Sequence, residues 1–93
     1  MKATKKGPDV EVVDIRLISG DGYLKAFADI KLAGCFIVKG FSVMRENQGF
    51  IVLFPRKPSK DGKWFDTVLP LDEKTKLLVE NLVLEAYDKE ISA

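Results

Sequence analysis

The sequence predicts an α+β fold, in which an antiparallel sheet of four or five strands carries one C-terminal helix packed on it. Residues 11–54 fall into short alternating or apolar runs separated by turn residues, which is typical of antiparallel strands. In residues 73–89 the apolar positions recur every three or four residues, as on one side of an amphipathic helix. A chain of 93 residues suits one domain, which we place at residues 10–93 after a flexible tail at residues 1–9.

The first two strands are predicted to form a hairpin. Residues 11–19 alternate between a charged face and an apolar face that holds Val13, Ile15 and Leu17. The Gly-Asp-Gly turn at residues 20–22 tolerates positive φ and joins this strand to the next. In residues 23–32 the alternation resumes, and the side chains expected to face the core are Leu24, Ala26, Ala28, Ile30 and Leu32.

The next two strands are apolar on both faces, which indicates strands that are central in a sheet or covered by a partner. Residues 50–54 are wholly apolar and end at Pro55, which has no N–H for a strand ladder. The lone Cys35 is expected to be a small buried residue, since it cannot form an internal disulfide. Along residues 35–46, simple alternation places Cys35, Ile37, Phe41 and Val43 on one face and Phe36, Val38 and Met44 on the other.

After a loop at residues 55–63 we expect a short strand at residues 64–69 and a helix at residues 73–89. Asp72 is the predicted N-cap, and Glu73 places negative charge in the first turn. The helix stripe predicted to face the sheet consists of Leu78, Val79, Leu82, Val83 and Ala86. Outside it, every seventh residue is apolar, and we assign these positions to a dimer contact: Leu77, Leu84 and Ile91.

Composition excludes several kinds of chemistry. The chain has no histidine and one cysteine, so Cys/His zinc sites and nucleophile arrangements that use histidine are excluded. No two carboxylates are spaced to form an acid–base pair, and the glycines do not follow the pattern of a phosphate-binding loop. We therefore expect no enzyme activity, metal, cofactor or small-molecule substrate.

Location follows from hydropathy. No apolar run approaches the roughly 18 residues of a membrane span, and residues 1–9 lack the apolar centre of a signal peptide. A cytoplasmic protein without a membrane partner is expected.

Charge is distributed unevenly along the chain. Residues 39–63 hold six basic and two acidic side chains, whereas residues 64–93 hold three basic and seven acidic ones. The densest basic segment is the loop at residues 55–63, which suits binding to phosphates, although a charged loop can also be simply solvated. The candidate nucleic-acid contacts are Arg56, Lys57, Lys60 and Lys63, with Lys39 and Arg45 of the preceding strand as extensions.

Aromatic residues close this basic loop. Trp64 and Phe65 could stack on unpaired bases, or they could anchor the loop to the core, which is the more common use of such a pair. Asp66 is expected to brace the loop by bonding its amides or Lys63. These residues are the candidate support or stacking positions of the site.

The order of elements in residues 11–89 resembles the SpoVG-like family of septation regulators. The matching pieces are Phe36-x-Val38, Val43, Gly49-x-Ile51-Val52, Pro55 with basic residues after it, Asp61-Gly62, Asp66 and Pro70. The chain departs from the family pattern in having Arg56 where a serine is usual and Leu69 where a histidine is usual.

The resemblance implies a bacterial regulator that binds DNA or RNA without catalysing a reaction. It also implies a homodimer formed by sheet-edge pairing, and roles in septation, cell division, sporulation or the control of gene expression. The alternative is a protein–protein adaptor of a division or regulatory complex, with the basic loop only solvated.

Overall fold

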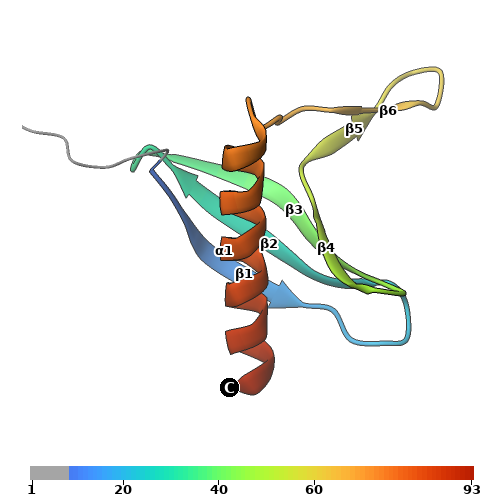
Figure 1. Ribbon diagram of the computed structural model, residues 1–93. Coiled ribbons are helices and arrows are strands. Elements are labelled where there is room, and N and C mark those ends of the chain that lie inside the picture. The colour runs from blue at the N-terminus through green and yellow to red at the C-terminus, as the bar shows by residue number, and fades with distance from the viewer. Residues whose placement is uncertain (1–8) are drawn as a thin grey trace, which may run out of the picture.

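The protein, represented by a computed structural model that describes residues 9–93, has a four-stranded antiparallel sheet, a small second sheet and one helix (Figure 1). Of the predicted tail, only Asp9 falls within the described residues. The main sheet has the order β1-β2-β3-β4, with strands β1 (Val10–Leu17), β2 (Leu24–Leu32), β3 (Phe36–Glu46) and β4 (Gly49–Leu53). The second sheet pairs β5 (Arg56–Pro58) with β6 (Trp64–Asp66), and α1 (Glu73–Ser92) follows. The predicted α+β architecture is confirmed.

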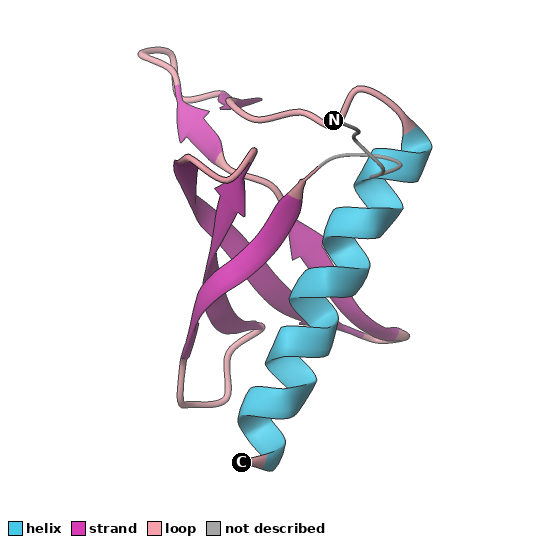
Figure 2. Ribbon diagram, turned by 90° about the vertical axis from the view of Figure 1, so that its left-hand side faces the viewer, coloured by secondary structure: helices cyan, strands magenta, loops and turns pink. Residues whose placement is uncertain are grey.

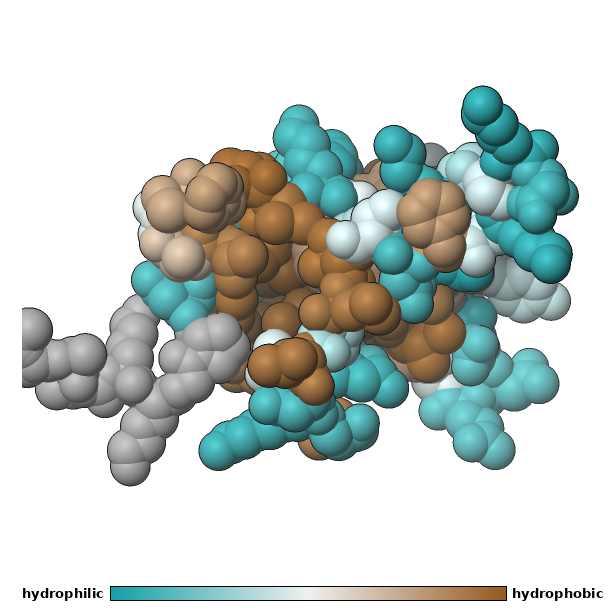
Figure 3. Space-filling view, turned by 90° about the horizontal axis from the view of Figure 1, so that it is seen from above, coloured by the Kyte–Doolittle hydropathy of each residue, from teal (hydrophilic) through white to brown (hydrophobic). Residues whose placement is uncertain are grey.

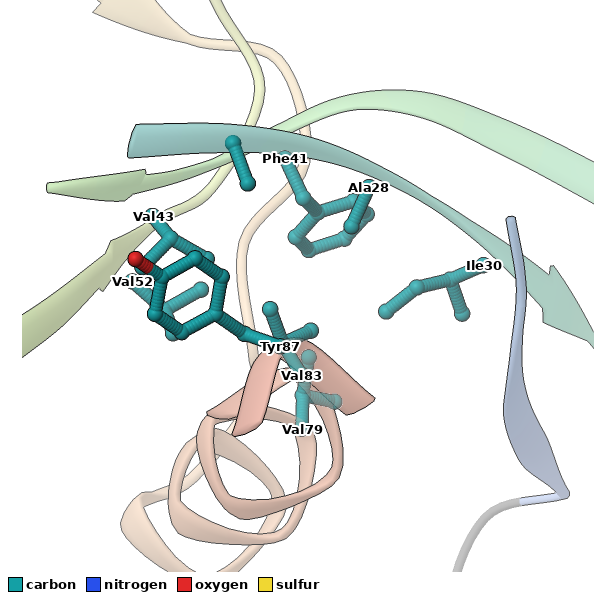
Figure 4. Close-up of a cluster of buried hydrophobic side chains, with 9 residues drawn as sticks. Ala28, Ile30, Phe41, Val43, Val52, Val79, Val83 and Tyr87 are labelled. Carbon is teal, nitrogen blue, oxygen red and sulfur yellow. The ribbon is translucent and has the colours of Figure 1, made fainter. Parts of the chain in front are cut away.

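Helix α1 lies across one face of the main sheet (Figures 1 and 2). Between them, side chains of β2, β3 and β4 point toward Val79, Val83 and Tyr87 of the helix (Figure 4). The buried core consists of Ala26, Ala28, Ile30, Phe41, Val43, Val52, Val79, Val83 and Tyr87. The predicted inward face of β2 is thus confirmed at its three central positions.

The helix begins where the sequence places it. Asp72 Oδ1 accepts a hydrogen bond from the Thr75 amide at 2.8 Å, which satisfies one free N–H of the first turn. That bond holds the pKa of the Asp72 carboxyl below its usual value. The helix continues to Ser92, three residues beyond the predicted end at position 89.

Tyr87 is a core residue that the predicted stripe omitted. It lies one turn after Val83, and its ring centroid is 5.4 Å from that of Phe50 on β4. The aromatic contact buries a tyrosine that its residue type alone would leave half exposed.

A bulge in β1 makes the predicted apolar face of that strand wrong at Val13, while Ile15 packs against the core as predicted. Val12 pairs with Ile30 and Asp14 pairs with Asp29, so Val13 has no partner in the ladder. One extra residue shifts the alternation by one position. Val12 and Ile15 therefore pack against the core, whereas Val13 is 44% exposed.

A second bulge, at Gly40, reverses the predicted faces of β3 before the glycine, while Phe41 and Val43 share one face as predicted. Phe41 pairs with Ala28 and Lys39 pairs with Asp29, so the glycine between them is unpaired. As a result Val38 packs against the same core as Phe41, and Ile37 lies on the opposite face, 52% exposed. The glycine has a φ of +105°, a conformation that side chains with a Cβ rarely adopt.

Cys35 is exposed, so its predicted burial is wrong. It belongs to the turn between β2 and β3, where Ala33 and Gly34 have φ values of 56° and 71°. A turn made by two residues in the left-handed region delays the start of β3 to Phe36, and Cys35 is left outside the strand.

Among residues 9–93 there is no helix long and apolar enough to cross a membrane.

Candidate nucleic-acid interface

The basic loop predicted at residues 55–63 is a β-hairpin. Strands β5 and β6 pair only with each other, and all of their residues are exposed. The hairpin extends away from the main sheet at the upper right of Figure 1. In the view from above, hydrophilic side chains gather at this end of the molecule (Figure 3). The predicted strand at residues 64–69 is shorter than expected and ends at Asp66.

The hairpin has two faces, which follow from its register. Arg56 pairs with Asp66, Lys57 with Phe65 and Pro58 with Trp64. Because side chains alternate along a strand, Arg56, Pro58, Trp64 and Asp66 share one face, here called the Trp64 face. Lys57 and Phe65 share the other, here called the Phe65 face, and the Ser59 N–H donating to the Lys63 carbonyl at 2.6 Å continues the alternation to Lys63.

Asp61, one of the two acidic residues of the hairpin, stabilises the turn at its tip. The Asp61 carboxylate accepts hydrogen bonds from Ser59 Oγ and, at 3.5 Å, from the Lys63 amide. These two bonds, the one from Ser59 first, hold the pKa of Asp61 below its usual value. Gly62 completes the turn with a φ of +85°. Asp61 therefore stabilises the turn.

On the Trp64 face a cation lies over the indole. Arg56 Cζ is 5.7 Å from the centroid of the Trp64 ring, within the range of a cation–π contact. Arg56 Nε is 3.7 Å from Asp66 Oδ1. An exposed ion pair adds little stability, so its main effect is to orient the guanidinium. Asp66 thus supports the site through Arg56, and not through Lys63 as the sequence suggested.

The three lysines of the hairpin point their charges to solvent. Lys57, Lys60 and Lys63 are exposed, and within residues 9–93 none of them has an ion-pair partner. Their charges are therefore available to an anionic partner.

The structure separates the two predicted extensions of this site. Lys39 precedes Gly40, where an added Cβ would lie 3.4 Å from Pro55 Cβ at the base of the hairpin. Arg45 lies near the β3–β4 turn, at the opposite end of β4 from the hairpin (Figure 1). Lys39 can extend the basic surface of the hairpin, whereas Arg45 belongs to another part of the molecule.

The heptad positions of the helix have different surroundings. Leu84 packs against the core of the same chain. Leu77 and Ile91 are 48% and 50% exposed. Two of the three residues therefore offer apolar surface to a partner.

An ion-pair network on the sheet face away from the helix was not predicted from the sequence. Arg16 donates two hydrogen bonds of 3.1 Å to Asp29, whose side chain is almost fully buried. Hydrogen bonds to Asp29 and then to Asp14 raise the pKa of Arg16. The strand register explains this network. Asp14 and Asp29 are paired across β1 and β2, and two adjacent carboxylates need a cation.

The sequence model of the SpoVG family matches residues 9–89. The chain belongs to the SpoVG family. The resemblance found in the spaced motifs is thereby confirmed over nearly the same residues.

Three relatives agree with this assignment. A protein of Bdellovibrio bacteriovorus is 39% identical over 70 residues, which cover 75% of this chain and 65% of that protein. One from Anaeromyxobacter sp. strain Fw109-5 is 32% identical over 88% of this chain and 86% of its own length. One from Listeria monocytogenes is 32% identical over 85% of this chain and 79% of its own length. All three are named SpoVG and described as candidate septation proteins.

Proposed function

We propose that this SpoVG-family protein is a cytoplasmic regulator that binds DNA or RNA through the β5–β6 hairpin and catalyses no reaction. The observation that carries the proposal is the set of three exposed lysines without ion-pair partners in the described chain, beside Arg56 on the same hairpin. The septation-protein names of its relatives support a role in septation, and we extend this role to cell division. Sporulation and gene-expression control are the further settings that the family resemblance supports.

Electrostatics supplies the affinity in this proposal. Each phosphate that a lysine neutralises releases condensed counterions, so the affinity falls as the salt concentration rises. The hairpin carries a net charge of +2 over residues 56–66, from four basic and two acidic residues. Asp66 is paired with Arg56, whereas Asp61 keeps its negative charge at the turn, and the lysines outnumber this one carboxylate.

A homodimer formed by sheet-edge pairing is the second part of the proposal. Strand β4 is an edge of the main sheet and lines a groove with apolar walls and a charged rim of Arg56, Asp66, Lys76 and Glu80. The apolar residues that line this groove are Ile51, Val52, Leu53, Phe54, Val68, Leu69 and Pro70. A second β4 paired along this edge would satisfy its free backbone groups and cover apolar surface at the same time.

A titration against labelled DNA and RNA at two salt concentrations tests the function. We expect the parent protein to bind with an affinity that falls steeply with salt. The variant with Arg56, Lys57, Lys60 and Lys63 all changed to alanine should bind weakly and with a shallower salt dependence, by about one in slope for each lost phosphate contact. Lys25→Ala, on the main sheet, is the matched control and should bind like the parent.

The alternative hypothesis is that the protein is a protein–protein adaptor, and one observation favours it. Phe36 and Ile37 at the start of β3 are 63% and 52% exposed, an apolar surface far from the hairpin. If the quadruple variant is folded and binds nucleic acid as tightly as the parent, the hairpin is not the site. If the parent binds neither DNA nor RNA at low salt, the adaptor hypothesis replaces the nucleic-acid function.

A further inference from the structure

The hairpin exposes two large aromatic side chains that the fold does not use. Trp64 is 58% exposed and Phe65 is 50% exposed. Neither belongs to the core cluster, nor to the partly buried residues packed against it. Loop anchoring, the common role of such a pair, therefore does not account for them, since an anchor would be buried against the core.

The two rings point in opposite directions. Trp64 and Phe65 are neighbours on β6, so one lies on the Trp64 face and the other on the Phe65 face of the hairpin. Each face also carries a cation, Arg56 on the first and Lys57 on the second. The hairpin thus offers two separate aromatic surfaces, each next to a positive charge.

Such surfaces fit the flat faces of nucleobases. Stacking is available to every base, and arginine adds a cation–π contribution. With Arg56 Cζ 5.7 Å from the ring centroid of Trp64, a base on the open side of the indole would extend an existing stack. A base can stack in this way only when it is not already stacked and paired within a duplex.

A duplex is the competing ligand, because the major groove admits a two-stranded β-ribbon. A ribbon that reads the groove needs side chains that form hydrogen bonds with base edges. Of the four residues on the Trp64 face, Pro58 has no side-chain hydrogen-bonding group and Trp64 has one donor. Within the described residues Arg56 keeps free N–H donors, but its guanidinium lies over the indole beside Asp66. The chemistry of this face therefore favours stacking over base-edge reading.

Hydrogen bonds at the base and at the tip of the hairpin preorganise it before a ligand binds. At its base the Thr67 amide and Oγ1 both donate to the Pro55 carbonyl, at 3.0 Å and 3.1 Å. At its tip Asp61 and Gly62 fix the turn. An isolated two-stranded hairpin is only marginally stable, so these contacts reduce the entropy that binding would otherwise cost.

We propose that the hairpin binds single-stranded nucleic acid, with unpaired bases stacked on Trp64 and Phe65 and the phosphates near Lys57, Lys60 and Lys63. This inference rests on the proposed function and narrows its ligand to strands with unpaired bases. The ligand chemistry is common to single-stranded DNA and single-stranded RNA.

The intrinsic fluorescence of the protein tests the proposal directly, because Trp64 is the only tryptophan in the chain. The probes are a 12-nucleotide single-stranded DNA, the RNA of the same sequence, and the DNA duplex, each also end-labelled for anisotropy. We expect a single strand to quench Trp64 emission with the same midpoint as the anisotropy change. The duplex should bind at least about tenfold more weakly, a difference of about 1.4 kcal/mol.

Two variants separate stacking from charge. Trp64→Leu and Phe65→Leu keep apolar bulk but remove the aromatic face, and each should weaken single-strand binding by about 5- to 150-fold. Trp64→Phe should restore most of the affinity that Trp64→Leu loses. Phe36→Leu, at an exposed aromatic position outside the hairpin, is the matched control and should bind like the parent. Far-UV circular dichroism shows that each variant is folded.

The outcomes distinguish this inference from the function it rests on. Binding that is equally tight to duplex and single strand, or unchanged in both leucine variants, overturns the stacking proposal and leaves the nucleic-acid function intact. No binding of any probe at low salt overturns both. Quenching by either single strand supports the proposal, and the ratio between DNA and RNA shows whether the 2′-hydroxyl contributes.

Discussion

In the main sheet, apolar side chains on one face are covered by α1, whereas in the β5–β6 hairpin both faces are exposed. Val43 and Val83 are completely buried in the first region, and Trp64 is 58% exposed in the second. Both regions are built from short antiparallel strands that contain apolar residues. The difference between them is the second layer, since the helix lies across the main sheet and the hairpin extends beyond it (Figure 1).

Under the proposed function, this comparison assigns stability and binding to different parts of the protein. A residue covered by the helix contributes by excluding water, and its loss should unfold the domain. A residue of the hairpin contributes surface and charge, and its loss should change what the folded protein binds. Five predictions test this division, from the largest expected effect on the free energy of unfolding to the smallest.

Replacing Val83 by aspartate should have the largest effect. Val83 is 0% exposed in the centre of the core, and a carboxylate there would have no partner. We expect a loss of about 4 kcal/mol in the free energy of unfolding, measured by urea denaturation. The control is Leu71→Asp, at a position that is 96% exposed, which should change this free energy by less than about 0.5 kcal/mol. Similar losses in the two variants would contradict the core described here.

Leu84→Glu should come next. Leu84 is half buried against the core, so the charge should cost about 2–3 kcal/mol of unfolding free energy. Ile91→Glu, one heptad later and 50% exposed, should leave the fold intact and shift the assembly toward monomer. Urea denaturation and sedimentation are the two measurements. If Ile91→Glu instead unfolds the domain and Leu84→Glu only dissociates it, our division of the heptad positions is wrong.

Gly40→Ala tests the junction between the two regions. At a φ of +105°, with Pro55 Cβ 3.4 Å from an added Cβ, the alanine should cost about 1–2 kcal/mol of unfolding free energy. Because Pro55 leads into the hairpin, single-strand affinity should fall as well. Gly22→Ala, where an added Cβ meets nothing within 4 Å, is the control. A thermal unfolding midpoint equal to that of the parent would show that the bulge tolerates a side chain.

Asp72→Asn should have a smaller, pH-dependent effect. The pKa of Asp72 is lowered in the folded protein, so the charged carboxylate stabilises it above the unfolded pKa near 3.8. This contribution should disappear as the pH falls through the lower folded pKa. Asparagine can still accept the Thr75 hydrogen bond but does not titrate there. The thermal midpoints of parent and variant should therefore differ at pH 7 and converge at the acid end. A difference between the two thermal midpoints that stays constant with pH would contradict this prediction.

The quadruple alanine variant of the hairpin basic residues should have the smallest effect on folding. Its four positions are exposed and lie outside the core, so the free energy of unfolding should change by less than about 0.5 kcal/mol. The same variant should lose most of its nucleic-acid binding. Large destabilisation together with lost binding would mean that the hairpin is part of the folding unit, and the division drawn above would fail.

The sequence by itself determined the elements and the composition of the candidate site. Alternation with turn residues is sufficient to locate strands, and Asp72 followed by an apolar stripe is sufficient to locate a helix, because these signals are local. The same holds for the basic residues of the hairpin, whose clustering is visible in eight consecutive positions. Spaced motifs were also enough to identify the family.

Only the tertiary structure decided which side chains are covered. The bulges at Val13 and Gly40 shift the alternation of β1 and β3, so the predicted faces hold on only one side of each bulge. A bulge depends on pairing with another strand, which one strand's pattern cannot show. The exposure of Trp64 also could not be predicted from the sequence, because it depends on which other elements lie over this residue. An aromatic residue after a strand is buried if a second layer lies over it, and α1 lies over the main sheet instead of over the hairpin. Burial is a relation between elements distant in sequence, so residue types and spacing leave it open.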